Sequence, residues 1–224
     1  MVRRAAAEAL GTAFLLTAIV GSGIMAERLA AGNIAIALLA NSVATGAALV
    51  ALILAFSDIS GAHFNPAVTL AAAMQGTMAW EDVPPYMLAQ LGGAFAGVAA
   101  AHLMFGLPLF VASQHARHGY GVLWSEFLAT FGLLAVIFGC VRARSSAVPF
   151  AVAAYITGAY WFTSSTSFAN PAVALARSAS DTFAGIRPTD VPGFIAAQFA
   201  GALAATLCFR WLQPEVLSKS EANV

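Results

Sequence analysis

Charged side chains are scarce in this chain of 224 residues. Lysine, arginine, aspartate and glutamate together make up 9% of it, whereas soluble domains carry roughly 25%. Hydrophobic residues reach 60% and the mean hydropathy is +0.82. A water-soluble globular domain is therefore excluded, and the composition indicates a chain that lies in a lipid bilayer.

The sequence also lacks an excess of either charge sign and an evident set of metal-ligating residues. Ten basic and ten acidic residues give a net charge of zero, which argues against nucleic acid as a partner. Cys140 and Cys208 lie in or at the end of apolar stretches, where cysteine behaves as a small hydrophobic residue. His115 and His118 have a spacing that could suggest a metal, but no third ligand is evident. We expect no metal, no cofactor and, without a recognisable nucleophile and base, no enzyme activity.

Long apolar stretches, in contrast, are abundant. A hydrocarbon layer about 30 Å thick needs roughly 20 apolar residues for each helical crossing. The first stretch is too long for the core of a cleaved signal peptide and contains Glu8. Six crossings are predicted, near residues 6–26, 34–56, 86–107, 121–141, 148–167 and 192–212.

The chain contains an internal repeat. Three landmarks recur in the same order in each half: "AEALGTAFLL" and "SEFLATFGLL", "NPAVTLA" and "NPAVALA", and "DVPPYMLAQLGGAFAG" and "DVPGFIAAQFAGALAA". Each half holds three crossings, so the second copy enters the membrane from the opposite side, as in inverted-repeat transport proteins. We predict a single transmembrane domain over 1–224, with one repeat at about 5–107, the other at about 121–212, and a short polar tail at 213–224.

Each half also carries an Asn-Pro-Ala triplet, formed by Asn65, Pro66 and Ala67 and by Asn170, Pro171 and Ala172. Asparagine is a favoured helix N-cap, and proline suits the first helical position. The helices expected after the triplets extend to about Gly76 and Ser180, which is only about 15 Å. Because neither can cross a bilayer, we predict two re-entrant half-helices that meet in the middle of the membrane.

The segments before the triplets, "SDISGAHF" and "TSSTSFA", are polar or irregular. Irregular backbone at membrane depth persists only inside protein or along a water-filled cavity. We therefore predict a pore lined by these two segments. Their carbonyls would accept hydrogen bonds, and the two asparagine side chains would donate them at the midpoint.

These features together resemble the major intrinsic protein family, the aquaporins and aquaglyceroporins, over nearly the whole chain. The resemblance rests on "SGAHFNPAVT" and "NPAVALA" in six crossings, with Glu8 and Glu126 at matching places. It implies an all-α membrane protein with six transmembrane helices and two re-entrant half-helices in an inverted 3+3 repeat. It also implies a passive channel and a homotetramer with one pore per protomer.

The resemblance further implies a constriction formed by four positions: Thr45, Gly158, Ser167 and Val173. Water-selective members have an aromatic residue, a histidine and an arginine where this chain has threonine, glycine and valine. We therefore expect a wide, arginine-free selectivity filter with small uncharged side chains. It would pass glycerol-type polyols, urea, metalloid hydroxides and water. Valine after the second triplet resembles the bacterial branch associated with arsenic resistance, which implies arsenite as a solute.

Five polar residues inside or near the crossings are predicted to brace the re-entrant loops: Glu8, Glu126, His63, Gln90 and Gln198. Intramembrane carboxylates are functional suspects by default, so a proton relay through Glu8 and Glu126 is the alternative. His63 could instead sense pH at one mouth of the pore.

Arginine and lysine indicate the orientation. Six crossings place both chain ends on one side, which collects Arg3, Arg4, Arg142, Arg144, Arg210 and Lys219, against Arg28, Arg117, Arg177 and Arg187 on the other side. Both termini are thus expected in the cytoplasm, with the chain in the plasma membrane, which in a bacterium is the inner membrane.

Two other functions remain possible from the sequence: a water-selective aquaporin and a secondary transporter. The transporter is less favoured because the re-entrant helices carry no ionisable residue near the asparagine pair.

Overall fold

The structure is a computed structural model that describes residues 1–143 and 145–213. Every regular element within these ranges is helical. The helices are α1 (Val2–Leu29), α2 (Ile34–Ser60), α3 (Pro66–Met74), α4 (Val83–Met104), α5 (Tyr120–Ala143), α6 (Val148–Phe162), α7 (Pro171–Arg177) and α8 (Val191–Leu212), with short 3₁₀ turns η1 (Trp80–Asp82), η2 (Ser145–Ala147) and η3 (Pro188–Asp190).

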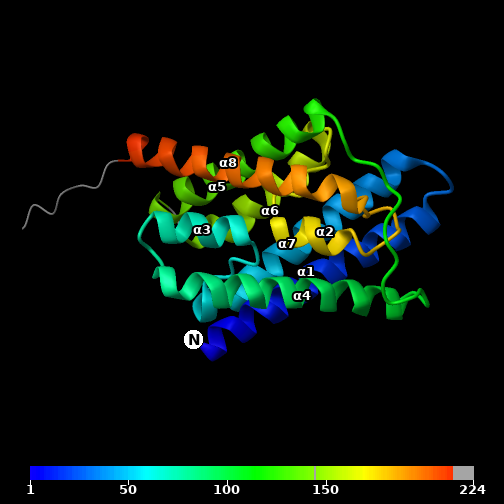
Figure 1. Cartoon of the computed structure of the whole chain (residues 1–224), viewed down its shortest axis with the longest axis horizontal. Coiled ribbons are helices and arrows are strands. Elements are labelled where there is room, and N and C mark those ends of the chain that lie inside the picture. Colours follow the sequence, from blue (N-terminus) through cyan, green and yellow to red (C-terminus); the bar gives the residue numbers. More distant parts are fainter. Residues whose placement is uncertain (144, 214–224) are drawn as a thin grey trace, which may run out of the picture.

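The long helices run side by side, and the two short ones lie end to end between them (Figure 1). The start of α1 and the end of α8 lie at the same end of the bundle, which we call the terminal face. The loops 30–33, 105–119 and 178–190 lie at the other end, the opposite face. The α3 helix runs from the middle toward the terminal face, and α7 runs from the middle toward the opposite face.

The expected fold class is confirmed, with one boundary corrected. Within the described residues, five helices are long and apolar enough to cross a membrane, but α6 has only 15 residues, which is about 22 Å. The predicted crossing at 148–167 was therefore too long. The Thr163 hydroxyl donates to the Ala159 carbonyl at 2.6 Å, and Thr163 itself is extended, so the chain leaves the helix there and folds back into the pore-lining segment.

Both half-helices also end earlier than the sequence indicated. The α3 helix ends at Met74 and is followed by Gly76 with φ of 75°. The α7 helix ends at Arg177, and the hydroxyl of the next residue, Ser178, donates to the Leu175 carbonyl at 2.7 Å. A local side-chain bond of this kind competes with helix continuation.

Small residues let the helices of each repeat approach closely. A Cβ on Gly93 of α4 would overlap the carbonyl of Ala9 in α1, and a Cβ on Gly201 of α8 would overlap the carbonyl of Phe127 in α5. Since lipid offers no hydrophobic drive for helix association, such backbone contact is a main source of packing in membranes. The same contact in both repeats places the two halves symmetrically around the half-helices.

Candidate functional site

The two segments that lead into the triplets share one backbone pattern. At four, three and one residues before each asparagine, φ is positive: Gly61 (86°), Ala62 (51°), Phe64 (49°), Thr166 (62°), Ser167 (50°) and Ala169 (48°). A non-glycine residue in this region costs about 1–2 kcal/mol. Strain of this kind persists only where the surroundings over-determine it, and it marks functional segments.

The triplets themselves cap the half-helices and join them. Asn65 Oδ1 accepts a hydrogen bond from the Ala67 amide at 2.9 Å, and Asn170 Oδ1 accepts from the amides of Ala172 and Val173. Across the interface, Asn65 Nδ2 donates to the Ala169 carbonyl at 2.7 Å. Asn170 Nδ2 donates to the Phe64 carbonyl at 2.8 Å. The two helix N-termini, each equivalent to about +0.5 charge, therefore meet head to head.

Glu8 lies behind the first segment and is fully buried. Its carboxylate accepts hydrogen bonds from the Ser60 hydroxyl and from the amides of His63 and Phe64. Gln90 Nε2 donates to it at 2.8 Å. The His63 ring is hydrogen-bonded to the hydroxyl of Thr69, a residue of α3, which Gln90 also contacts.

Glu126 occupies the matching place behind the second segment and is also fully buried. It accepts hydrogen bonds from the amides of Phe168 and Ala169, both at 2.9 Å. Gln198 Nε2 donates to it at 2.6 Å. The five residues expected to brace loops thus all contact the two re-entrant segments, either directly or through a carboxylate.

A cavity of about 700 Å³ passes between the helices and the joined triplets. Arg4, Asp58 and Arg142 line it near the terminal face, and Asn65 and Asn170 line it further in. The opposite-face loops 105–119 and 178–190, both described, contribute nothing to its lining. The cavity therefore opens toward the terminal face and ends beyond the asparagine pair, before the loops of the opposite face.

The cavity wall has two kinds of surface. The helical wall is apolar on α6, where the lining residues Val148, Val152 and Ile156 recur every four positions. The facing wall consists of the strained segments with their backbone groups and of the asparagine side chains. A molecule inside would meet hydrocarbon on one side and hydrogen-bonding groups on the other.

Three of the four predicted constriction residues line the inner end of the cavity: Thr45, Ser167 and Val173. Gly158 does not, and its placement there was wrong. It is exposed on the far side of α6 beside Phe162, because residues two positions apart on a helix point in nearly opposite directions. Tyr160 continues the lining face instead, and its hydroxyl is hydrogen-bonded to Thr45 at 3.2 Å.

Arg177 also lines this end of the cavity and is 2% exposed. Its guanidinium carbon lies 3.4 Å from the centroid of the Phe168 ring, and its Nε donates to the Ala184 carbonyl. The expectation that small uncharged side chains alone surround the constriction therefore needs correction. Position 173 is valine, but an arginine reaches the same region from one turn further along α7.

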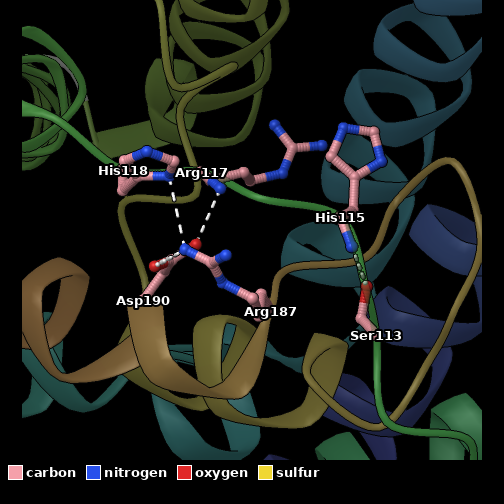
Figure 2. A network of polar contacts seen from close by, with 6 residues as sticks. All are labelled: Ser113, His115, Arg117, His118, Arg187 and Asp190. Carbon is pink, nitrogen blue, oxygen red and sulfur yellow. Dashed lines mark hydrogen bonds and ion pairs between the residues drawn. The ribbon is translucent and has the colours of Figure 1, made fainter.

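The loop 105–119 fastens the segment before the second triplet. Arg117 donates to the carbonyls of Gly185 and Ser165 at 2.8 and 3.3 Å. Its own amide donates to Asp190, which also accepts from Arg187 (Figure 2). Figure 2 shows the Arg117 and His115 side chains on the same side of the loop.

The charges in this loop affect His115. Burial and the positive charges of Arg117 and Arg177 lower the pKa of His115 below its ordinary value of 6.5. The imidazole is therefore neutral at pH 7.

Tyr160, Arg177 and Arg117 were not assigned to the site from the sequence. A signal existed for Tyr160, since it continues a four-residue spacing of apolar positions, and for Arg177, which follows Val173 by one helical turn. For Arg117 there was none, because a loop residue reaches the segment before the second triplet only through tertiary structure.

Comparisons with known proteins show which family the chain resembles in sequence. The model of the family described as "Major intrinsic protein" matches residues 1–165, which include the first triplet. The aquaglyceroporin AqpS of Rhizobium meliloti is 54% identical over 212 residues, covering 95% of this chain and 91% of that protein. Aquaporin NIP1-4 of Oryza sativa is 32% identical over 210 residues, with 91% of this chain and 74% of that protein covered.

A solved structure shares the fold. The X-ray structure of the aquaglyceroporin from Plasmodium falciparum superimposes with a TM-score of 0.73 and covers 93% of this chain and 95% of that one, at 22% identity. With its apolar helices and joined half-helices, the chain is a multi-pass membrane channel for small solutes and not an enzyme. It belongs to the major intrinsic protein family.

Proposed function

We propose that this protein is a passive channel for small uncharged solutes: glycerol-type polyols, metalloid hydroxides such as arsenite, and water. The observation that carries the proposal is the cavity that runs past the joined triplets and has Val173 in its lining. In the family this position usually carries the filter arginine. Valine leaves position 173 itself without a long charged side chain.

Two features of the cavity support neutral solutes. The paired half-helix N-termini place positive potential at the midpoint, which opposes cations. The walls offer hydrocarbon on one side and hydrogen-bonding groups on the other. A polyol or a trihydroxide has no charge to desolvate. Its hydroxyl groups can replace their hydrogen bonds to water with hydrogen bonds to the cavity wall.

The selectivity filter in this proposal consists of Thr45, Ser167 and Val173, with Tyr160 in place of Gly158. The pore motifs are the two triplets, and Glu8, Glu126, His63, Gln90 and Gln198 hold the loops that carry them. The similarity to a protein named aquaglyceroporin supports glycerol among the solutes. Arsenite rests on the valine and its resemblance to the bacterial arsenic-resistance branch.

The proposal includes the cellular setting. The channel lies in the plasma membrane, in a bacterium the inner membrane, with both termini cytoplasmic and with one domain built from two repeats. The distribution of arginine supports this orientation, and the resemblance to the major intrinsic protein family supports assembly as a homotetramer with one pore per protomer.

A water-selective aquaporin is the main alternative, favoured by the bulky side chains of Tyr160 and Arg177 in the lining of the cavity. A secondary transporter is less favoured, because α3 and α7 hold no ionisable residue beside the asparagine pair.

The test is solute entry into vesicles that contain the purified protein. Stopped-flow light scattering with glycerol, urea and sorbitol, and arsenite uptake by metal analysis, should show entry of glycerol and arsenite that rises linearly with concentration. Water permeation without glycerol entry would establish the aquaporin alternative. Saturable entry coupled to an ion gradient would establish the transporter.

A further inference from the structure

Arg177 is buried without an acidic partner among the residues that the structure describes. It is the largest of the fully buried side chains, with 2% of its surface exposed, and arginine is almost never fully buried unless paired. The ion pairs among the described residues join Arg4 to Asp82 and Arg187 to Asp190. The positive charge of Arg177 is therefore not neutralised by a salt bridge within this part of the chain.

The fold holds this charge at the inner end of the cavity. Arg177 lies four residues after Val173, so the two share a face of α7, and both line the cavity. Stacking on Phe168 and the bond from Nε to the Ala184 carbonyl fix the guanidinium against one wall. No hydrogen bond from its two Nη groups occurs within the described residues, so these donors remain for the cavity.

A second polar group points to a ligand at the same place. Ser167 Oγ is buried, lines the cavity and has no hydrogen-bond partner within the described residues. A buried hydroxyl without a partner is costly unless a passing molecule or water satisfies it. Arg177 can donate to a solute oxygen while Ser167 bonds to a second one, which suits a neutral solute with at least two hydroxyl groups.

We propose that Arg177, held on Phe168 one turn beyond Val173, supplies the charge that excludes cations and a donor that guides hydroxylated solutes. The inference rests on the proposed channel function and adds the residue that makes it selective. Ions would thus be excluded by Arg177 and not by the residue directly after the triplet. Valine at position 173 would then widen the pore without loss of charge selectivity.

The test compares ion leak and glycerol entry in vesicles with matched protein content. The variants are Arg177→Gln, Arg177→Lys and the double variant Arg177→Gln with Val173→Arg. Arg177→Met is a second neutral variant, because an unbranched apolar side chain can still pack on Phe168. Arg28→Gln, which removes an exposed arginine near the same face, is the control. The leak of protons and potassium is driven by an applied membrane potential and followed with a pH-sensitive dye.

The neutral variants should raise the cation leak by about tenfold or more, since a unit charge near the path acts over several ångströms. Arg177→Lys and the double variant should restore a low leak, and Arg28→Gln should resemble the wild type. An unchanged leak in Arg177→Gln or Arg177→Met, with glycerol entry intact, would overturn this inference and leave the channel function standing. Wild-type vesicles that admit no neutral solute would instead overturn the channel function itself.

Discussion

The two re-entrant segments have the same backbone but different surroundings. Both have left-handed residues at matching places, an asparagine that caps its own half-helix and bonds to the other segment, and a buried glutamate behind them. Each triplet is followed by a valine, and the residue one helical turn further on differs between the repeats. It is Ala72 in the first half-helix and Arg177 in the second, and both line the cavity.

A second difference lies behind the half-helices. Thr69 of α3 is hydrogen-bonded to His63 and Gln90, whereas the corresponding residue of α7 is Ala174, which has no polar side chain. The second segment is instead fastened by Arg117 from the loop 105–119. The comparison teaches that features shared by both repeats shape the pore, while features present in one repeat are the candidates for selecting what passes.

The largest expected effect comes from removing a shared feature. Glu8→Gln and Glu126→Gln each place an amide NH₂ against donors that now face a carboxylate, at a cost of about 1.5–3 kcal/mol for each hydrogen bond lost. Both variants should lower the thermal unfolding midpoint in detergent. Glu8→Gln should lower it more, since Glu8 accepts four bonds and Glu126 three.

Glu27→Gln, at an exposed position of α1, is the control and should leave the midpoint unchanged. If Glu126→Gln were as stable as this control, the bracing of the second segment would not depend on its carboxylate.

The close helix contacts give the next effect. Gly93→Ala and Gly201→Ala force a Cβ into the carbonyls of Ala9 and Phe127 and should destabilise the protein by about 1–3 kcal/mol each. Gly92→Ala is the matched control, because a Cβ there meets no atom within 4 Å. It should be neutral or stabilise by about 0.5–1 kcal/mol, since glycine is unfavourable within a helix. Equal unfolding midpoints for Gly92→Ala and Gly93→Ala would contradict the close approach of α1 and α4.

The joined midpoint can be tested by charge. Asn65→Asp and Asn170→Asp place an acid where two positive helix ends meet, and an acid offsets their combined charge of about +1. Cation conductance in planar bilayers should rise several-fold in both. The increase should remain below that of Arg177→Gln, because Arg177 still repels cations at the inner end of the cavity. Conductance at the wild-type level in both aspartate variants would show that the midpoint is not a barrier to cations.

The smallest effect concerns pH. The fold lowers the pKa of His115, so between the lowered value and 6.5 the unfolded chain binds a proton that the folded chain does not. Stability should therefore fall slightly as the pH drops from 7 to 5, and His115→Gln should remove that contribution. Thermal unfolding across this range measures it. A loss on acidification that is the same in His115→Gln would have another source.

Much of the architecture was predictable because it depends on local chemistry. The length of the apolar stretches, the capping asparagines followed by proline and the repeated landmarks led to the six helices and the two half-helices. The end of α6 was not predictable, since the polar residues after Phe162 could extend a crossing or begin a loop. Gly158 was misplaced because its position was carried over from the family resemblance, which does not fix the face of α6 that meets the cavity.

The charge at the constriction also needed tertiary information. In the sequence Arg177 belongs to a polar stretch that follows an apolar one, where an arginine normally reaches toward water. Only the position of Phe168 and of the Ala184 carbonyl shows that its side chain turns inward.

The central claim is that neutral solutes pass beside Val173 at the inner end of the cavity. Glycerol and water permeabilities of vesicles with wild-type, Val173→Thr and Val173→Arg protein test it most directly. Threonine keeps the volume of valine and should keep glycerol entry, whereas arginine should abolish glycerol entry and leave water permeation measurable. Unchanged glycerol entry in Val173→Arg, at equal protein content, would contradict the account.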